Sequence, residues 1–167
     1  MPALTAGAGD NPGVIVPPPI LYLGALIVLV VLRWAWPAPI LASASLALNA
    51  GIVLGVLALA LGLWAVLTMR SAGTNVDPRR MSTTVVTAGP FRYTRNPIYV
   101  GFDLLFVGFT LALNDWWGAV LLVPLVVVMH VGVIRREERY LEQKFGGDYL
   151  RYKDYLRYKN DVARYVG

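Results

Sequence analysis

One stretch of the sequence, GPFRYTRNPIYVG at residues 89–101, gathers side chains suited to binding a small charged ligand. Arg95 can hold a carboxylate through paired, charge-assisted hydrogen bonds, and the amide of Asn96 both donates and accepts hydrogen bonds. Tyr93 and Tyr99 add aromatic surface with a hydroxyl at its edge. The stretch is too polar for the interior of a bilayer and runs directly into an apolar segment. It therefore predicts a ligand site at a membrane surface.

Acidic and imidazole side chains form a second group further along the chain. His130, Glu137 and Glu138 are spaced so that they share one face of a helix. Asp103 lies one turn beyond Tyr99 in an apolar segment, where an ionisable group is costly and usually faces a partner or a polar cavity. Such carboxylates can balance cationic groups on a ligand or accept a proton. For Asp103 and His130, an interhelical hydrogen bond with no role in binding is the alternative interpretation.

The composition places these groups in a membrane protein. Hydrophobic residues make up 57% of the chain and charged residues 15%, and the mean hydropathy is +0.57. The 167 residues are enough for one domain of about four spans of roughly 20 residues each. The sequence has no cysteine, which excludes disulfides and thiolate metal ligands. We expect no metal cofactor.

The apolar runs define the elements that must position the site. They cover residues Ile20–Trp36, Leu41–Met69, Ile98–Leu113 and Trp116–Ile134. We therefore predict an all-α membrane protein with a flexible lead-in over 1–17, four spanning helices within 18–134, and helices in a polar segment over 135–167. The second run has 29 residues and would be about 43 Å long as a helix, so it must tilt, bend or protrude from a core of roughly 30 Å.

The basic residues indicate the orientation. Fourteen of the fifteen Lys and Arg residues lie in segments 70–97 and 135–167, which should both face the cytoplasm by the positive-inside rule. An even number of spans then places both termini in the cytoplasm, and we expect the cytoplasmic (inner) membrane. The net charge of +5 suits anionic lipid headgroups, so the bilayer is the expected partner and nucleic acid is not.

The third and fourth runs predict a helical hairpin that brings the polar groups together. Asn114 and Asp115 form the turn, and residues whose numbers add up to about 229 should lie at similar depth because both helices rise about 1.5 Å per residue. Tyr99 is then level with His130. Arg95 lies near the level of Glu137 and Glu138. We expect a cluster at the cytoplasmic mouth, either as a ligand site or as ion pairs that only hold the hairpin.

Two further features have two interpretations each. Gly51 and Gly55 form a small-residue seam, which either packs against another helix or serves as a groove for substrate. After Phe145, the glycines at 146 and 147 should end a charged helix. The following helix should bury a narrow stripe of Tyr149, Tyr152 and Leu156, and it either covers a cofactor or only anchors the chain to headgroups.

The segments GPFRYTRNPIYVG and REERYLEQKFGGDYLRYK resemble the signature of the isoprenylcysteine carboxyl methyltransferase and phospholipid methyltransferase family, roughly from Val86 to Tyr158. Its members are integral membrane enzymes that use S-adenosylmethionine (SAM) without a Rossmann domain. The resemblance implies a cofactor pocket with one wall from Tyr93, Arg95, Asn96, Pro97, Tyr99 and Gly101, and another from His130, Glu137 and Glu138. Asn96 stands where eukaryotic prenylcysteine enzymes carry a histidine, and an amide cannot take a proton.

The sequence thus predicts SAM-dependent methyl transfer to a lipophilic or membrane-embedded acceptor. Arg95, Asn96, Glu137 and Glu138 are the expected catalytic residues, and Asp103, Gly51 and Gly55 the expected substrate contacts. SAM would enter from the cytoplasm and the acceptor from the bilayer. The alternatives are an NADPH-dependent oxidoreductase similar to membrane sterol reductases, and a non-catalytic helical adaptor or small transporter.

Overall fold

The computed structural model describes residues 12–77 and 80–166, the last eight of them by their backbone alone. Most of the predicted lead-in, residues 1–11, lies outside the described residues. No strand occurs among the residues that the structure describes. The helices are α1 (Pro18–Ala35), α2 (Ala44–Ser71), the short 3-10 helix η1 (Gly89–Arg92), α3 (Pro97–Leu113), α4 (Trp117–Met129), the π-helical turn η2 (His130–Ile134), α5 (Arg135–Phe145) and α6 (Gly147–Val166).

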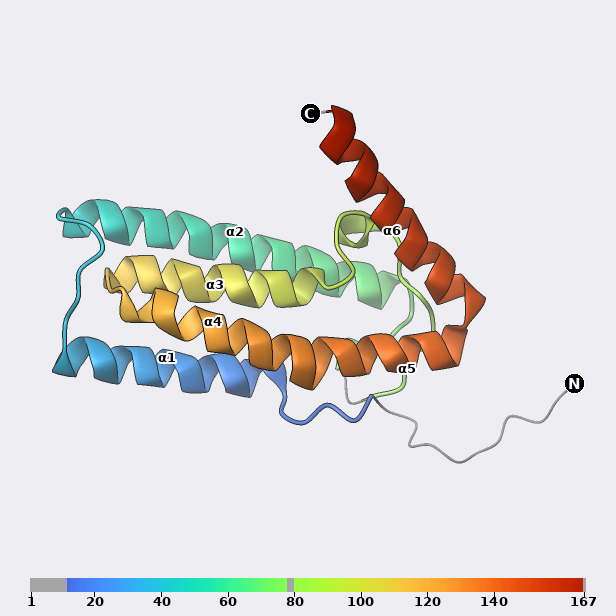
Figure 1. Cartoon of the computed structure of the whole chain (residues 1–167), viewed down its shortest axis with the longest axis horizontal. Helices are drawn as coiled ribbons and strands as arrows, with labels where there is room; N and C mark the ends of the chain where they lie inside the picture. The colour runs from blue at the N-terminus through green and yellow to red at the C-terminus, as the bar shows by residue number, and fades with distance from the viewer. Residues whose placement is uncertain (1–11, 78–79, 167) are drawn as a thin grey trace, which may run out of the picture.

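The helices form a membrane-spanning bundle, as the apolar runs predict. Three of them are long and apolar enough to cross a bilayer: α1, α2 and the continuous rod of α4, η2 and α5. The fourth apolar helix, α3, has 17 residues and is about 25 Å long. Figure 1 shows α1 to α4 side by side along the long axis, with α6 slanting away from the end of α5. The chain is an all-α membrane protein.

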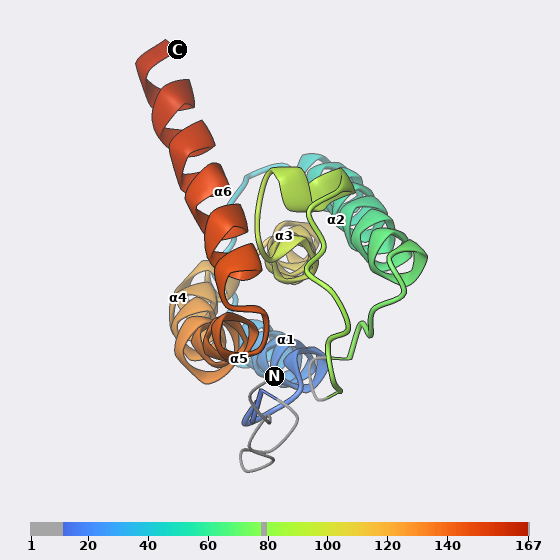
Figure 2. The same cartoon turned by 90° about the vertical axis from the view of Figure 1, so that its right-hand side faces the viewer.

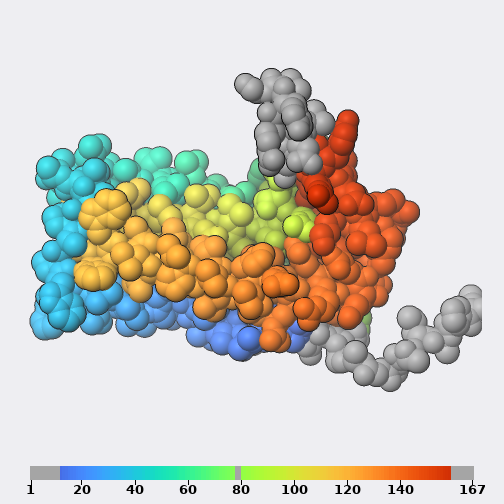
Figure 3. All heavy atoms as spheres, viewed as in Figure 1, coloured from blue at the N-terminus to red at the C-terminus, as the bar shows by residue number. Residues whose placement is uncertain are grey.

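The bundle has two different ends. We call the end where α1 and α3 begin and where α2 and α5 finish the polar end, and the opposite end the turn end (Figure 1). Figure 3 shows α4 lying between α1 and α3 on one face, with α5 and α6 at the polar end. Viewed along its length in Figure 2, the bundle has α3 at its centre, with α2 on one side and α1 and α4 on the other.

The most extensive packing in the bundle is between α2 and α3. A Cβ atom added at Gly51 would lie 2.4 Å from the backbone nitrogen of Ala112 and 2.5 Å from the carbonyl oxygen of Gly108, so the two helices touch backbone to backbone. One at Gly108 would lie 3.1 Å from the nitrogen of Gly55. The predicted substrate groove at Gly51 and Gly55 is therefore wrong, because α3 fills the seam.

At the turn end, Asn114 links the turn between α3 and α4 to the connection between α1 and α2. Its backbone is left-handed (φ 51°), which reverses the chain between α3 and α4 and confirms the predicted hairpin turn. Its side chain reaches the connection between α1 and α2, where Oδ1 accepts hydrogen bonds from the amides of Ile40 and Leu41. Nδ2 donates to the carbonyl oxygen of Leu41 at 2.8 Å.

Asp115 makes a second connection at the turn end. Its side chain is fully buried and accepts hydrogen bonds from the backbone amides of Ala38 and Trp117, each at 3.1 Å. The guanidinium of Arg33 lies 3.9 Å from Asp115 and donates to the carbonyl oxygen of Leu113. These contacts satisfy polar groups that lipid cannot solvate.

Because Gly51 lies in the seam and Gly62 does not, we expect alanine substitutions at these two glycines of α2 to differ in their effect on stability. Gly51→Ala should destabilise the protein by about 1–3 kcal/mol, because the methyl group meets backbone atoms that cannot move aside alone. Gly62→Ala is the matched control, since nothing lies within 4 Å of its added Cβ. Thermal unfolding in detergent, followed by circular dichroism, should show a lower midpoint for Gly51→Ala only. Equal midpoints for the two variants would contradict the packing role of the seam.

Candidate functional site

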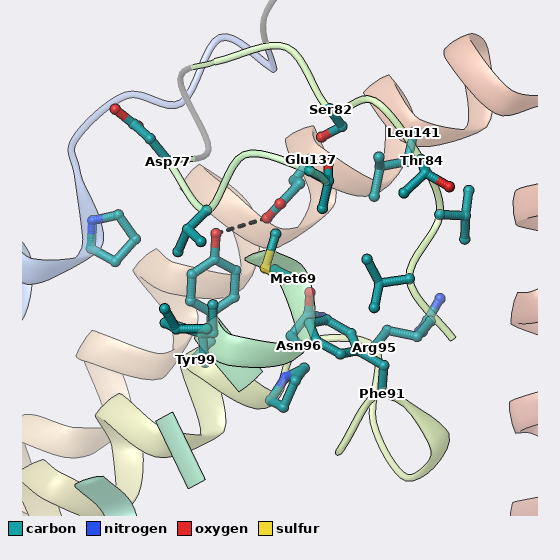
Figure 4. A pocket seen from close by; sticks show the side chains of 18 of the residues that line it. Met69, Asp77, Ser82, Thr84, Phe91, Arg95, Asn96, Tyr99, Glu137 and Leu141 are labelled. Atoms are coloured by element: carbon teal, nitrogen blue, oxygen red, sulfur yellow. Dashed lines mark hydrogen bonds between the residues drawn. The ribbon is translucent and has the colours of Figure 1, made fainter. Parts of the chain in front are cut away.

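A cavity of about 440 Å³ lies at the polar end of the bundle. This volume is within the range of roughly 300–1,000 Å³ that small-molecule sites occupy. Its walls come from the loop between α2 and α3, from η1, from the start of α1 and from parts of α2, α3, α5 and α6. Figure 4 shows side chains of the loop, α3 and α5 that face it. We call it the main cavity. Its polar lining residues are Thr74, Asp77, Ser82, Thr84, Arg95, Asn96, Tyr99, Glu137, Tyr149 and Tyr152.

The start of α3 places the first group of polar side chains. Pro97 occupies the first helical position, where its missing N–H and fixed φ are compatible with a helix. The backbone carbonyl of Asn96 accepts hydrogen bonds from the amides of Tyr99 and Val100. The side chain of Asn96 makes no capping hydrogen bond and lines the main cavity instead. Its amide is therefore available to a ligand.

Tyr99 and Glu137 connect the two arms of the hairpin. The Tyr99 hydroxyl donates a hydrogen bond to Oε2 of Glu137 at 2.7 Å, shown as a dashed line in Figure 4. Tyr99 is 8% exposed and sits in the first turn of α3, whereas Glu137 sits in the first turn of α5. The bond orients a carboxylate that lines the cavity. It also brings the polar groups of both arms to one place, as the hairpin predicts.

Arg95 and Glu138 form a second contact between the arms. Nη1 of Arg95 lies 2.9 Å from Oε1 of Glu138, which makes an ion pair. Its N–H bonds are not aligned with that oxygen, and Nη1 has no hydrogen-bond partner among the described residues although the atom is buried. A buried donor without a partner is costly. Because Arg95 also lines the main cavity, this nitrogen is suited to an anionic group of a ligand.

The loop between α2 and α3 covers one side of the cavity. Thr83 fixes its shape, because its amide donates to Oγ1 of Thr74 at 3.1 Å and its hydroxyl donates to the carbonyl oxygen of Gly73 at 2.7 Å. The amide of Ser82 donates to the hydroxyl of Tyr140 on α5 at 3.3 Å. These bonds fasten the loop across the cavity, where it contributes Asp77 to the lining.

The helix α6 covers another side. Tyr149, Tyr152 and Leu156 are buried, as the predicted stripe requires, and both tyrosines line the main cavity. The Tyr152 hydroxyl donates to the carbonyl oxygen of Phe91 at 2.6 Å. Burial raises the pKa of Tyr152 to about 12, while the charge of Arg95 acts in the opposite direction. The phenol therefore stays protonated and able to donate at neutral pH.

Glycine and one ion pair set the direction in which α6 runs. As predicted, α5 ends at Phe145, and Gly146 follows with a φ of 50°, which strongly favours glycine. Lys153 on α6 reaches back to Glu142 on α5, with Nζ 2.5 Å from Oε1. The break and the ion pair turn the buried stripe of α6 toward η1 and the cavity.

The structure brings only part of the predicted site residues together. Those that line the main cavity are Arg95, Asn96, Pro97, Tyr99 and Glu137, and Glu138 joins them through its ion pair with Arg95. Those that do not line it are Tyr93, Gly101, Asp103, His130, Gly51 and Gly55. Tyr93 is 65% exposed just beyond η1. Gly101 faces α2, where an added Cβ would lie 3.3 Å from the carbonyl oxygen of Ala58.

His130 is exposed and lies apart from the glutamates of α5 for a definite reason. It begins the π-helical turn η2, which ends at Ile134. A π turn closes its hydrogen bonds over five residues rather than four, so it holds one more residue than an α turn. The α-helical spacing from His130 to Glu137 therefore no longer returns to the same face. The expectation that one face carries all these side chains is wrong for His130.

Asp103 has a partner on another helix. The Tyr22 hydroxyl of α1 donates to Oδ1 of Asp103 at 2.5 Å, and the Tyr22 ring stacks on Phe102 with centroids 5.2 Å apart. Asp103 lines neither the main cavity nor any other described cavity. This is the interhelical hydrogen bond that the sequence left open as an alternative, and the substrate contact of Asp103 stays a prediction.

Sequence reasoning missed several lining residues of the cavity. Asp77 and Thr84 come from the loop, and Met69 comes from the end of α2. For the two loop residues the only signal is the length of the polar segment between two spans, because long loops within compact domains often carry function. No residue pattern distinguishes their positions.

The fold and the cavity define an integral membrane protein with a small-molecule site at one end of a helical bundle. A model of the phospholipid methyltransferase family matches residues 46–148. This match covers more than half of the chain, and the protein belongs to that family of membrane methyltransferases. The matched segment includes α2, the loop, η1, α3 and α5, which supply most of the cavity walls. No curated protein and no solved structure matches the chain.

The contact of α6 with the cavity wall can be tested with two tyrosines. Tyr152→Phe should lower the local stability of α6 by about 1–3 kcal/mol, because the buried carbonyl of Phe91 loses its donor. Tyr155→Phe is the matched control, since Tyr155 is 55% exposed. Hydrogen–deuterium exchange should be faster over 147–158 and 89–92 in Tyr152→Phe alone. The same exchange in both variants would mean that this bond does not hold α6 in place.

Proposed function

We propose that the protein transfers methyl groups from SAM, bound in the main cavity, to a lipophilic acceptor that enters from the bilayer. The observation that carries the proposal is the lining of the cavity. A guanidinium whose buried Nη1 has no aligned hydrogen-bond partner among the described residues and an oriented carboxylate face one chamber of about 440 Å³ in a member of a methyltransferase family. SAM has a carboxylate, two cationic groups, ribose hydroxyls and an adenine ring, and each has a counterpart here.

The charged groups of SAM match two charged side chains that the hairpin brings to the cavity, Arg95 and Glu137. Arg95 is the residue that would hold the carboxylate, because its Nη1 is buried, has no aligned partner and lines the cavity. Glu137 would face the cationic groups, since Tyr99 fixes one of its oxygens and leaves the carboxylate in the cavity wall. Glu138 supports this arrangement by pairing with Arg95, and the Asn96 amide adds a hydrogen-bonding group.

The remainder of the cavity suits the nucleoside. Its apolar wall includes aromatic and aliphatic side chains against which a flat base can pack, among them Phe91, Met69, Val85, Ile98 and Leu141. Carboxylate and hydroxyl groups of the loop, such as Asp77 and Thr84, are acceptors of the kind that bind ribose hydroxyls.

The protein's contribution to the reaction would be placement in a dry chamber. When bound, SAM supplies a methyl group on a positively charged sulfur, and the acceptor attacks it in line. Tyr149 and Tyr152 of α6 and the loop line the chamber and would cover bound SAM, which would limit its contact with water. Residues held in place around SAM would also reduce the entropy lost when the reacting groups are aligned. A carboxylate or thiolate acceptor needs no base. For an amine or hydroxyl acceptor, Glu137 is the candidate to take the proton.

The distribution of charge supports an orientation for the site. The loop over 70–97 and the segment over 135–167 both lie at the polar end and carry most of the basic residues. The positive-inside rule then places the polar end, and with it the main cavity, on the cytoplasmic side of the membrane. SAM would enter from the cytoplasm, and both ends of the chain would face that compartment.

Ligand binding separates this function from its alternatives. We expect isothermal calorimetry on the purified protein to show saturable binding of SAM and of its demethylated product, because both present a carboxylate and an ammonium to the cavity. NADPH should give no heat of binding. Binding of NADPH without SAM would support a reductase, and binding of neither would support an adaptor or transporter.

Glu137→Gln should weaken SAM binding about ten- to a hundredfold, equivalent to roughly 1.5–3 kcal/mol, because it removes the charge that balances the cationic groups. The amide oxygen can still accept the Tyr99 hydrogen bond, so the fold should remain. Asp154→Asn is the control, since Asp154 is exposed on α6 and does not line the cavity. The measurements are calorimetry with SAM and transfer of labelled methyl groups from SAM into lipid, protein or volatile products. Unchanged binding in Glu137→Gln would contradict the assignment.

A further inference from the structure

The start of α1 forms part of the wall of the main cavity. It lines the cavity with three consecutive prolines, Pro17, Pro18 and Pro19. Figure 4 shows the segment that leads into α1, in faint blue, on the same side of the cavity as Asp77 and Tyr99. Proline has a fixed φ and no N–H, so this wall is stiff and offers a ligand no backbone donor. Because α1 lies outside residues 46–148, the family match does not account for this wall.

The chain before the prolines is fastened to η2 and α5. The carbonyl oxygen of Gly13 accepts a hydrogen bond from Nη1 of Arg136 at 3.1 Å. Val14 packs against the hydrophobic core of the bundle. The side chain of Ile15 lies 3.8 Å from a Cβ atom added at Gly132. One end of the proline segment is therefore fixed, and its position at the cavity depends on what holds the other end.

Tyr22 holds that other end against α3. Its hydroxyl donates to Oδ1 of Asp103 at 2.5 Å, and the residue is 7% exposed. Tyr22 follows Pro18 by four residues and Pro19 by three, so the three share one face of α1. The Tyr22 ring stacks on Phe102, with ring centroids 5.2 Å apart, and Phe102 lines the main cavity. Tyr22 thus connects two parts of the cavity wall, one from α1 and one from α3.

The chemistry of this contact exceeds what packing alone needs. A carboxylate in an apolar helix is costly, and apolar side chains of similar size would hold two helices together at lower cost. A hydrogen bond has a preferred length and direction, which apolar contacts lack, so it fixes the rotation of α1 about its own axis. Neither Tyr22 nor Asp103 lines the main cavity. The pair therefore suits a role in placing the wall.

We propose that Tyr22 and Asp103 are positioning residues for the ligand of the main cavity. Their hydrogen bond holds the start of α1 against α3, so that the proline wall and Phe102 stay in contact with bound SAM. The inference rests on the function proposed above and adds two residues that act on SAM binding without lining its cavity. A wall that is in place before the ligand arrives reduces the entropy lost on binding. Loss of the hydrogen bond therefore lowers the affinity for SAM.

The opposite end of α1 supplies a matched control. There, at the turn end, Nε1 of Trp117 on α4 donates to the carbonyl oxygen of Trp36 at 2.8 Å. Tyr22→Phe and Trp117→Phe each remove one hydrogen bond that fastens an end of α1, and both keep an aromatic ring. Only the first of these bonds lies beside the main cavity. Asp103→Asn is the conservative variant, because its side chain keeps an oxygen that can accept from Tyr22.

Because the chain has no cysteine, cysteines introduced at Ile20 and Leu67 can carry nitroxide labels at these two points alone. Both positions are exposed, on α1 and α2, and neither lines the main cavity. Pulsed electron paramagnetic resonance on the full-length protein in lipid nanodiscs then measures the distribution of distances between the labels without any ligand. The distribution should broaden in Tyr22→Phe and stay narrow in Trp117→Phe and Asp103→Asn. A narrow distribution in Tyr22→Phe, or broadening in all three variants, overturns the proposal.

Calorimetry with SAM on the same variants, without the added cysteines, gives an independent measurement. Tyr22→Phe should weaken SAM binding about three- to tenfold, as expected for the loss of one hydrogen bond, and Trp117→Phe less than about twofold. Equal effects of these two variants, or no effect of Tyr22→Phe, would mean that the bond only stabilises the fold and would overturn the proposal. A wild-type protein that binds no SAM contradicts the proposed function instead. The distance distribution then decides alone, and broadening confined to Tyr22→Phe supports the placement of the wall by this bond.

Discussion

The backbone contact between α2 and α3 fixes the helix that carries Tyr99, and the rest of the site is arranged around this helix. Glycine at 51, 55 and 108 allows the two helices to approach until their main chains touch, which makes α3 the central helix of the bundle. Lipid offers no hydrophobic driving force between helices, so close packing of this kind must supply the association. With α3 fixed in the centre, its first turn reaches the main cavity, where Pro97, Ile98 and Tyr99 form part of the wall.

The sequence predicts the helices well and the site in part, and the difference has a physical cause. A long apolar run indicates a segment that lies in lipid, and a segment in lipid must be helical. Four helices and the turn at Asn114 therefore follow from these runs. The contacts of Tyr99 with Glu137 and of Arg95 with Glu138 follow from the same hairpin, because depth in two antiparallel helices depends only on rise per residue. The buried stripe of Tyr149, Tyr152 and Leu156 on α6 also follows from the helical spacing of these residues.

Other features could not be predicted because the sequence carries no periodic signal for them. The π turn at 130–134 has an ordinary apolar composition, so the placement of His130 outside the site required coordinates. The loop residues that complete the cavity, such as Asp77, are positioned by single hydrogen bonds such as that between Ser82 and Tyr140. For Asp103, an acid in an apolar helix indicates a polar partner, but the partner Tyr22 lies on a helix distant in sequence.

The π turn also affects how the gene for this protein can vary. Because a π turn holds one more residue than an α turn, deleting one residue within 130–134 would restore a regular α-helix and leave α5 close to its present rotation relative to α4. Glu137 and Glu138 would then still face Tyr99 and Arg95. In a regular α-helix each lost residue rotates everything that follows by about 100°, so a lost codon is more easily tolerated in this short segment than in the helices on either side of it.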